Sequence, residues 1–456
     1  MKYHIVTLGC PKNAVDSEGM DGILAGEGHQ QVASTDDADV IIVNTCSFIA
    51  AARGETLGVL RDLGVAKRAG QRLIAAGCMA QSHGDLVSGV TGVDATLSTQ
   101  QWMRVGDLVG ERTSTSGRQV PVIGLEPVSP DIQHSTFNLQ HSYADWRTAQ
   151  IRRRRSAPSA YLKISDGCNL RCAFCTIPSF KGDMASKPVG AILAEAQELA
   201  ACGVREIVLV AQHLTDYGRD LQIADGLATL LDELCQVLPT DIWLRLMYAY
   251  PHGMSERLIQ VIAARPQIVK YLDMPLQHAH PDTLRRMRRP PDADRTRAII
   301  RDLRAAMPDM AMRSTFIVGF PGETSAEFRE LLGFLDEVRL DRVGAFRYSQ
   351  EPGTHAATLP GQVRPQVIEK RWHELMQLQQ GISHERSQRW LGRMIDVLVE
   401  GHGNAGDGRP IALGRSFRDA PEVDGQVFVW GGPPIGEIVT VRVTQATDYD
   451  LWGEVA

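Results

Sequence analysis

Three cysteines stand within eight residues near the middle of the chain, and this crowding restricts the chemistry more than any other feature. Cys168, Cys172 and Cys175, which we call the central triad, form a C-x3-C-x2-C pattern in the segment DGCNLRCAFC. Three unligated thiols so close together would be reactive. Zinc fits less well, because a structural zinc site is closed and needs a fourth ligand nearby. Thiolates on one short loop favour an iron–sulfur cluster with one iron left open for a small ligand.

The rest of the sequence indicates a reducing compartment, in which clustered cysteines bind metals rather than pair as disulfides. The chain begins MKYHIVTLGC, which is typical of a strand and lacks the apolar stretch and cleavage site of a signal peptide. No uninterrupted apolar run reaches the roughly 18 residues of a membrane span. We therefore expect a cytoplasmic protein without membrane association, in which the eight cysteines stay reduced.

A second set of cysteines shares one structural context although its members are far apart in the sequence. Cys10, Cys46 and Cys78, the amino-terminal triad, each stand at the end of a short apolar segment that predicts a buried parallel strand. Parallel strands share a carboxyl edge, where open α/β sheets bind ligands. A buried, inert cysteine would explain any one of these positions. Three equivalent strand ends together favour a second three-cysteine cluster.

The spacing of apolar segments predicts three folding units. Residues 1–126 alternate strand and helix, which predicts a parallel α/β sheet of flavodoxin-like type. After a polar linker at 127–160, residues 161–390 contain six strand–helix units and predict a partial (β/α)6 barrel, because an eight-unit barrel needs more chain. A long amphipathic helix at 364–391 leads into residues 391–456, whose short alternating runs predict a small antiparallel β-barrel. The expected strands of the partial barrel are 161–165, 205–212, 243–248, 271–277, 312–319 and 342–349, and the expected helices are 188–202, 254–264, 292–307 and 325–338.

Seven short motifs connect these units to a known family. They are GCPKN (9–13), NTC (44–46), KISDGC (163–168), IPSFKG (177–182), YLDMPLQH (271–278), RSTFIVGFPGET (313–324) and GRS (414–416). With them the sequence resembles, over almost its whole length, the RimO family of radical S-adenosylmethionine (SAM) methylthiotransferases, which modify an aspartate of small-subunit ribosomal protein S-twelve. The resemblance implies two 4Fe–4S clusters, one on each triad, and identifies the last unit as a TRAM domain, an accessory substrate-binding module.

The same resemblance implies separate roles for the two clusters. The cluster on the central triad would bind SAM and cleave it reductively to a 5′-deoxyadenosyl radical, which removes hydrogen from the aspartate β-carbon. Sulfur held by the cluster on the amino-terminal triad would then quench the carbon radical, and a second SAM would supply the methyl group. The reaction also requires a sulfur donor and an electron donor, and the sequence identifies neither of them.

Five further motif residues are candidate SAM-binding groups: Gly319, Gly322, Glu323, Gln277 and Arg313. The first three follow the fifth predicted strand at the barrel mouth, although a tight turn with a helix-capping carboxylate would explain them equally well. Gln277 ends the fourth strand together with His278, and both could face the cavity, but a histidine there is more often a structural hydrogen-bonding group. Arg313 would pair with a carboxylate of SAM or substrate, or form a surface ion pair.

Four features lie outside this scheme. His213 departs from the family pattern, which has an aspartate at this position of AQHLTDYG. Cys202 and Cys235 lie in predicted helices, and we interpret both as core residues. The basic run Arg152 to Arg155 is interpreted as solvated, with a phosphate or partner contact as the alternative. None of these features involves the predicted cluster ligands.

Charge favours a protein substrate over RNA. The whole chain has a mild formal charge of −6, without the basic excess of a nucleic-acid-binding protein. Residues 393–456 contain five Lys/Arg against ten Asp/Glu, which leaves −5. Such a domain suits a basic ribosomal protein and repels the phosphates that a tRNA adenosine methylthiotransferase, the main alternative, would bind. A solvated acidic face without a partner is the simpler explanation.

These inferences give two further expectations. Asp419, Glu422 and Asp424 should contact the basic substrate, and removal of 393–456 should weaken substrate binding while SAM cleavage continues. An iron–sulfur carrier without turnover is a hypothesis of another class. It would not need a six-unit barrel or an accessory binding domain, and reductive cleavage of SAM would distinguish the two.

Overall fold

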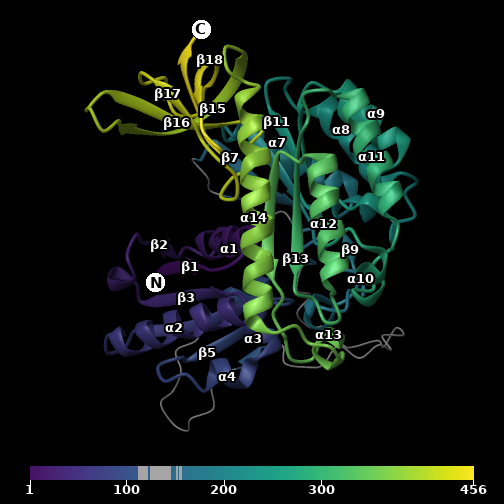
Figure 1. Cartoon of the computed structure of the whole chain (residues 1–456). Coiled ribbons are helices and arrows are strands. Elements are labelled where there is room, and N and C mark those ends of the chain that lie inside the picture. The colour runs from purple at the N-terminus through teal and green to yellow at the C-terminus, as the bar shows by residue number, and fades with distance from the viewer. Residues whose placement is uncertain (111–121, 124–144, 150–152, 154–156) are drawn as a thin grey trace. The chain divides into compact units, whose positions relative to one another are not determined.

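The computed structural model describes residues 1–110, 122–123, 145–149, 153 and 157–456 (Figure 1). The chain forms two compact units, which we describe separately. The first unit contains residues 1–155, 166–171 and 175–191, and the second contains 156–165, 172–174 and 192–456. Within the described residues, no helix combines the length and the apolar character that are needed to cross a membrane.

The first unit is built on a parallel sheet of six strands in the order β2-β1-β3-β4-β5-β6. This is the strand order of flavodoxin-like sheets, which confirms the predicted type. Ile42 of β3 packs towards α1, whereas its neighbour Ile41 packs towards α2, because successive side chains of a strand point to opposite faces. The strands are β1 (Lys2–Thr7), β2 (Gln30–Gln31), β3 (Val40–Thr45), β4 (Arg72–Gly77), β5 (Ala95–Ser98) and β6 (Val122–Ile123).

Helices cover both faces of this sheet, as a parallel sheet requires. They are α1 (Pro11–Gly26), α2 (Ala50–Ala66), α3 (Cys78–Ser82), α4 (Gly84–Ser88) and α5 (Val105–Gly110). The segment 175–191 of the same unit contributes α6 (Ile177–Lys181), β9 (Ala185–Ser186) and the start of α7 (Val189–Ala201). The short strand β8 (Ser165–Asp166) lies where the chain passes between the units.

The second unit contains six parallel strands in the order β14-β13-β12-β11-β10-β7, and this topology confirms the partial (β/α)6 barrel. Its strands are β7 (Ser159–Lys163), β10 (Glu206–Val210), β11 (Trp243–Leu246), β12 (Ile268–Asp273), β13 (Ala311–Val318) and β14 (Arg342–Arg347). The helices after α7 are α8 (Gly226–Val237), α9 (Glu256–Ala264), α10 (Pro281–Arg286), α11 (Ala293–Ala306), α12 (Ser325–Val338), α13 (His355–Thr358) and α14 (Pro365–Gln388).

One predicted strand of this sheet is displaced. β12 occupies Ile268–Asp273, whereas the apolar pattern predicted 271–277. Pro275 explains the early end, because proline has no N–H to donate to the strand ladder. Gln277 then returns to the sheet through a single bridge to Phe316.

The last five strands close into a small barrel in the order β15-β16-β17-β19-β18. They are β15 (Met394–Asn404), β16 (Pro410–Ser416), β17 (Val427–Trp430), β18 (Ile438–Ala446) and β19 (Leu451–Val455). The predicted barrel is confirmed, but its strands are not all antiparallel, because β17 and β19 pair in parallel. Alternating valines, such as Val427 and Val429, fill the interior.

Buried ion pairs join this barrel to the six-stranded sheet. Arg245 of β11 and Glu206 of β10 are fully buried, with 2.7 Å between Nε and Oε1. Arg415 of the barrel reaches the other oxygen of Glu206 at 2.5 Å. The Arg245 guanidinium also donates to the backbone carbonyl of Phe417 at 2.7 Å. Breaking a buried pair leaves an unpaired charge, so this network resists separation of the two parts.

Two acidic residues that we expected to contact the substrate belong to this junction instead. Asp419 is 1 % exposed and pairs with Arg342 of β14 at 2.9 Å. The Asp424 side chain is 2 % exposed and accepts the hydroxyl of Tyr271 at 2.6 Å. Of the three residues, only Glu422 is exposed. The prediction is therefore wrong for Asp419 and Asp424, because their carboxylates face arginines of the same unit, Arg342 and Arg313.

The structure also tests three isolated interpretations. Cys202 follows the last turn of α7 and is exposed, so its interpretation as a core residue is wrong. Cys235 is buried in α8, as predicted. Arg153 is buried and lies 3.6 Å from the carboxylate of Glu18, so it is not solvated. The other three arginines of the basic run lie outside the described residues.

Candidate functional site

The amino-terminal triad lies at one edge of one sheet. Cys10 follows β1, Cys46 follows β3 and Cys78 follows β4, and these three strands are neighbours in the sheet. Because the strands are parallel, their carboxyl ends meet at the same edge. The sequence prediction that these thiols converge is thus consistent with the strand order.

Two glycines allow the close approach of these loops. Gly9 has φ +92°, and a Cβ at this position would lie 2.7 Å from the Cβ and 2.8 Å from the Sγ of Cys46. Gly77 has φ +95°, and a Cβ there would lie 2.2 Å from the Asn44 amide oxygen. A larger residue at Gly9 would therefore displace a predicted ligand.

Asn13 fixes the loops of the amino-terminal triad to one another. Its amide nitrogen donates to the carbonyls of Leu8 at 2.9 Å and Thr45 at 3.0 Å. Its amide oxygen faces the Cys78 thiol at 3.6 Å. One buried side chain of the GCPKN motif thus contacts the segments that carry all three cysteines, a role that no sequence pattern indicated.

Burial disfavours the thiolate form of two cysteines of this triad, Cys46 and Cys78. All three cysteines of the triad are free of disulfides. Burial raises the pKa of Cys46, and it raises the pKa of Cys78 to about 12, with the charge of Cys10 adding to both shifts. A bound metal deprotonates a coordinating thiol outright, and sulfur donors suit iron–sulfur clusters. Three converging soft donors therefore fit the predicted cluster.

Two members of the central triad belong to the same compact unit as the amino-terminal triad. Cys168 is buried and its N–H donates to the carbonyl of Gly182 at 3.1 Å. Gly167 precedes it at φ +79°, where a Cβ would lie 2.2 Å from the Asp183 carbonyl oxygen. Cys175 is half-buried, and its sulfur accepts the N–H of Ile177 at 3.4 Å. The loop is thus held on both sides of its ligands.

Cys172, the middle member of the central triad, belongs to the second unit. The next residue, Ala173, donates its N–H to the Met287 carbonyl at 2.9 Å and accepts the Ala356 N–H at 2.8 Å. Phe174 packs edge-on against Phe320, with 6.4 Å between ring centroids. These contacts attach the chain on the carboxyl side of Cys172 to the second unit.

The candidate SAM-binding loop after β13 is a tight turn closed by its own carboxylate. Gly319 and Gly322 have φ values of +78° and +77°. Glu323 accepts the backbone N–H groups of Gly319 and Phe320, the second at 3.0 Å. Burial raises the pKa of Glu323 to about 7 despite the opposing charge of Arg371, which lies 3.2 Å away. The turn that we considered as the alternative is therefore present.

Gln277 and His278 occupy the end of the fourth strand region. Gln277 has φ +72°, and its backbone pairs with Thr315 and Ile317 at 2.8 Å. His278 is 2 % exposed, and burial lowers its pKa to about 3, so it is neutral. Its Nδ1 accepts the N–H of His280 at 3.0 Å, and its Nε2 has no partner in the described part of the chain.

Arg313 and His213 are both held inside the second unit. Arg313 donates to Asp273 at 2.7 Å and lies 3.5 Å from Asp424, so its ion pairs are internal rather than on the surface. His213 is buried edge-on against Tyr250, with 5.3 Å between ring centroids. Burial lowers the pKa of His213 to about 4, which leaves a neutral ring where the family pattern has a charged group.

Curated relatives match this chain from end to end. A protein of Chloroflexus aurantiacus is 72% identical and covers 100% of this chain and 99% of its own length. A protein of Roseiflexus sp. (strain RS-1) is 67% identical, with 100% and 97% coverage. One of Geobacter sulfurreducens is 40% identical, with 100% and 98% coverage. All three are named ribosomal protein uS12 methylthiotransferase RimO. The chain belongs to the RimO family.

This family assignment makes the chain a radical SAM methylthiotransferase, with 4Fe–4S and SAM as cofactors. Family models agree along its length: the uncharacterized protein family UPF0004 matches residues 2–98, the radical SAM superfamily 162–335, and the TRAM domain 391–456. A solved radical SAM methyltransferase, TsrM from Kitasatospora setae with cobalamin and a 4Fe–4S cluster bound, shares the fold at a TM-score of 0.57 and 14% identity. That similarity covers 78% of this chain and 76% of TsrM.

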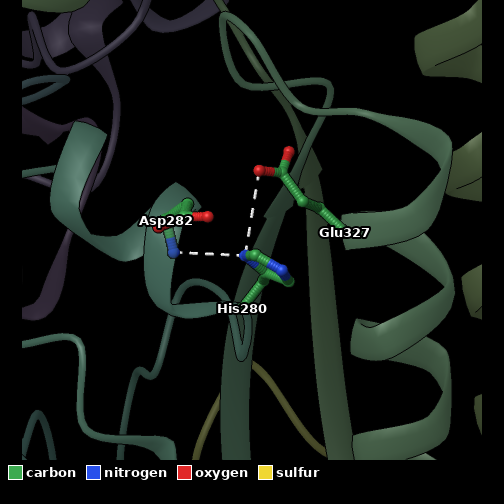
Figure 2. Close-up of side chains that lie close together, drawn as sticks. All are labelled: His280, Asp282 and Glu327. Atoms are coloured by element: carbon green, nitrogen blue, oxygen red, sulfur yellow. Dashed lines mark hydrogen bonds and ion pairs between the residues drawn. The ribbon is translucent and has the colours of Figure 1, made fainter.

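A further cluster of ligand-type side chains in this methylthiotransferase was missed by the sequence analysis. His280, Asp282 and Glu327 have potential metal-binding atoms within 4.8 Å of one another. Figure 2 shows that His280 instead accepts the N–H of Asp282 and faces Glu327. Asp282 pairs with Arg285, and Glu327 pairs with Arg286 at 2.8 Å. His280 thus caps the amino terminus of α10, and the carboxylates of Asp282 and Glu327 are paired with arginines rather than left for a metal ion.

Proposed function

We propose that this methylthiotransferase inserts a methylthio group at the β-carbon of an aspartate in ribosomal protein uS12. The end-to-end match to relatives of that name, at 40–72% identity, carries the proposal. Both predicted cysteine triads support it, because the reaction needs one site for SAM cleavage and one for sulfur. A tRNA adenosine substrate remains as an outcome of the test below.

We assign Cys168, Cys172 and Cys175 as ligands of the cluster that binds SAM. When bound, the reduced cluster and SAM supply the 5′-deoxyadenosyl radical that removes the β-hydrogen. The protein holds the ligand loop through Gly167 and the Cys168 N–H, so that the thiolates keep their places.

We assign Cys10, Cys46 and Cys78 as ligands of the second cluster, at which sulfur is held for transfer. Burial of Cys46 and Cys78 keeps bulk water from these ligands. Asn13 holds the loops on the sheet edge and contacts the Cys78 thiol, so it acts as a positioning residue.

The five candidate SAM-binding residues divide into two kinds. We propose that Gly319, Gly322 and Gln277 shape the backbone that surrounds SAM, since their left-handed φ values set the course of the chain after β12 and β13. Glu323 and Arg313 would act indirectly, because their charged groups are already used by the turn and by Asp273.

The substrate would dock through exposed acidic groups of the small barrel. Asp396, Glu437 and Glu454 are exposed there, in contrast to Asp419 and Asp424. A basic ribosomal protein fits such a surface, because opposite charges steer encounter and fix orientation. Because ribosomes are assembled in the cytoplasm, we place the enzyme there as well.

We further propose four regions in the chain: 1–126 as the methylthiotransferase domain with the second cluster, 127–160 as a linker, 161–390 as the radical SAM domain and 391–456 as the TRAM domain. The three family-model matches fall within the proposed domains and support this division.

The test is a reaction of anaerobically reconstituted enzyme with SAM, sulfide and a reductant, offered purified uS12 or tRNA. Mass spectrometry should find the methylthio group on a uS12 aspartate. The matched control replaces Cys168, Cys172 and Cys175 with alanine and should modify neither substrate. Methylthiolated tRNA with unmodified uS12 would replace our proposal by the tRNA alternative.

A further inference from the structure

Lys181 is a buried cation of the first unit that the proposed mechanism does not use. It is the last residue of α6, in the IPSFKG motif, and its side chain is 3 % exposed. Its ammonium lies 2.9 Å from Asp166 and 3.7 Å from Asp16, which is itself 2 % exposed. A lysine is seldom buried unless it is paired, so these two carboxylates account for its charged state.

The three charged groups lie between segments that carry both sets of predicted ligands. Asp166 precedes Cys168 by two residues, and Asp16 stands on the helix that begins after Cys10. The α6 segment also contacts the end of β5, where the Gln100 amide donates to the Phe180 carbonyl at 3.1 Å. Lys181 is thus held at the sheet edge of the amino-terminal triad.

Lys181 acts electrostatically on a member of that triad. Burial raises the pKa of the Cys78 thiol, and the positive charge of Lys181 is the largest influence in the opposite direction. Reciprocally, burial opposes the charged form of Lys181, but Asp166, Asp16 and Cys78 together hold its pKa above the usual range. The ammonium therefore stays protonated throughout the working pH range.

We propose that Lys181 supplies a fixed positive charge to the cluster bound by Cys10, Cys46 and Cys78, and thereby raises the reduction potential of that cluster. Reduction adds one negative charge to a cluster, so a nearby cation stabilises the reduced form, and net local charge is a known determinant of cluster potential. Asp16 acts with the opposite sign, because its carboxylate offsets part of the lysine charge. The inference rests on the proposed assignment of these three cysteines to a cluster.

The experiment uses full-length protein in which Cys168, Cys172 and Cys175 are alanine, so that only the cluster of the amino-terminal triad is measured. Lys181→Met, Lys181→Arg and Asp16→Asn are made in this background. Anaerobic redox titration followed by electron paramagnetic resonance gives the midpoint potential, and iron analysis gives the cluster content. The control is Lys67→Met, which removes a less buried lysine–carboxylate pair, 2.7 Å from Asp94, at the other edge of the sheet.

Lys181→Met should shift the midpoint potential to a more negative value, and Asp16→Asn should shift it to a more positive value. Lys181→Arg and Lys67→Met should leave it close to that of the parent. Opposite shifts separate an electrostatic role from a structural one, because a mere loss of packing would disturb both variants in the same direction. If Lys181→Met fails to retain iron, the midpoint potentials of Asp16→Asn and Lys181→Arg still test the electrostatic role of Lys181.

Unchanged potentials, or shifts of the same sign in Lys181→Met and Asp16→Asn with iron retained, would overturn the role of Lys181. A parent protein that binds no iron has a different meaning. It would contradict the cluster assignment on which the inference rests, and the two failures are therefore distinguishable.

Discussion

At the scale of single residues, the site of the amino-terminal triad tolerates little change because its loops touch. Gly9 shows this most directly, since a Cβ added there would lie too close to the Cβ and the Sγ of Cys46. As a ligand, Cys46 would have to keep both atoms in their present positions. Asn13 holds the same loops by hydrogen bonds. Ligand geometry in this methylthiotransferase thus depends on residues that are not ligands.

Gly9→Ala should therefore lose the cluster of the amino-terminal triad. The matched control is Gly28→Ala, at φ +84° with no atom within 4 Å of the added Cβ. The control should lose only about 1 kcal/mol of stability from the left-handed backbone, with its iron content unchanged. Iron analysis and thermal unfolding of both variants give the comparison, and equal iron in the two proteins would contradict the steric argument.

Replacing Cys10, Cys46 and Cys78 together with alanine should separate the two half-reactions. Formation of 5′-deoxyadenosine from SAM should continue, because the central triad is intact, while methylthiolation of uS12 should fall to background. Chromatography measures 5′-deoxyadenosine formation, and mass spectrometry of uS12 measures methylthiolation. The reverse triple variant, at Cys168, Cys172 and Cys175, should lose both activities. If the first variant stops cleaving SAM although it is folded and still binds one cluster, this division of roles is wrong.

At the scale of elements, β10 and β11 are joined to the small barrel by one carboxylate. Glu206 accepts from Arg245 on the neighbouring strand and from Arg415 of the barrel, and all three side chains are at most 5 % exposed. Burial alone would raise the pKa of Glu206, but the two arginines outweigh it and lower the pKa to about 2. The folded state thus favours the ionised form more strongly than the unfolded chain does.

This shift predicts how stability depends on pH. Because the folded pKa is depressed below the usual 4.5, the Glu206 contribution is present above pH 4.5 and is lost as the pH falls towards 2. A difference of this size corresponds to about 3 kcal/mol. Glu206→Gln should lose about 3–5 kcal/mol at neutral pH, as expected when one partner of a buried pair is removed.

Denaturant unfolding at pH 7 and at pH 3 measures both effects. The wild type should lose more stability between these pH values than Glu206→Gln does. The control is Glu437→Gln, which changes an exposed carboxylate of the barrel and should behave as the wild type. An unaltered acid dependence in Glu206→Gln would show that Glu206 does not control it.

At the scale of the whole molecule, the small barrel is part of the structure of the second unit as well as a candidate docking surface. It supplies Glu206, Arg342 and Tyr271 of the sheet with their partners Arg415, Asp419 and Asp424. The sequence alone suggested an appended module that can be removed. The junction indicates instead that its removal leaves buried charges unpaired.

Removal of residues 393–456 should therefore destabilise the radical SAM domain and reduce SAM cleavage as well as substrate binding. This replaces our sequence-based expectation that cleavage continues. Thermal unfolding and 5′-deoxyadenosine formation by the truncated protein test it. A truncated protein as stable and as active in SAM cleavage as the intact chain would restore the independent-module view.

Charge reversal separates the two roles of the acidic barrel. Lysine at Asp396, Glu437 and Glu454 should weaken uS12 binding with the fold retained, and the loss should shrink as salt rises, because screening weakens exposed charge interactions. Asp419→Lys should instead unfold the junction, because it places a second cation beside Arg342. Titration with purified uS12 at two salt concentrations, together with circular dichroism, measures both. Unchanged binding by the surface variant would exclude this face as the docking site.

The sequence by itself determined the fold class, the two cysteine triads and the family of this enzyme. Strand periodicity and the placement of cysteines at strand ends are local patterns that can be recognised in the sequence. In any parallel sheet the carboxyl ends of the strands lie at one edge, so cysteines at these ends lie at that edge too. The partial barrel follows in the same way from six repeated strand–helix units.

Only the tertiary structure decided which charged side chains are available to bind a ligand or a partner and which are paired inside the protein. Asp419, Asp424 and Arg313 read as surface or ligand-binding groups in the sequence, yet each is paired inside the second unit with a residue far away along the chain. In the first unit, Lys181 is likewise paired with a distant residue, since Asp16 lies 165 positions earlier. Pairing of this kind depends on long-range packing, which residue type and local spacing do not encode. The physical reason is that a buried charge persists only beside a partner that the fold brings to it.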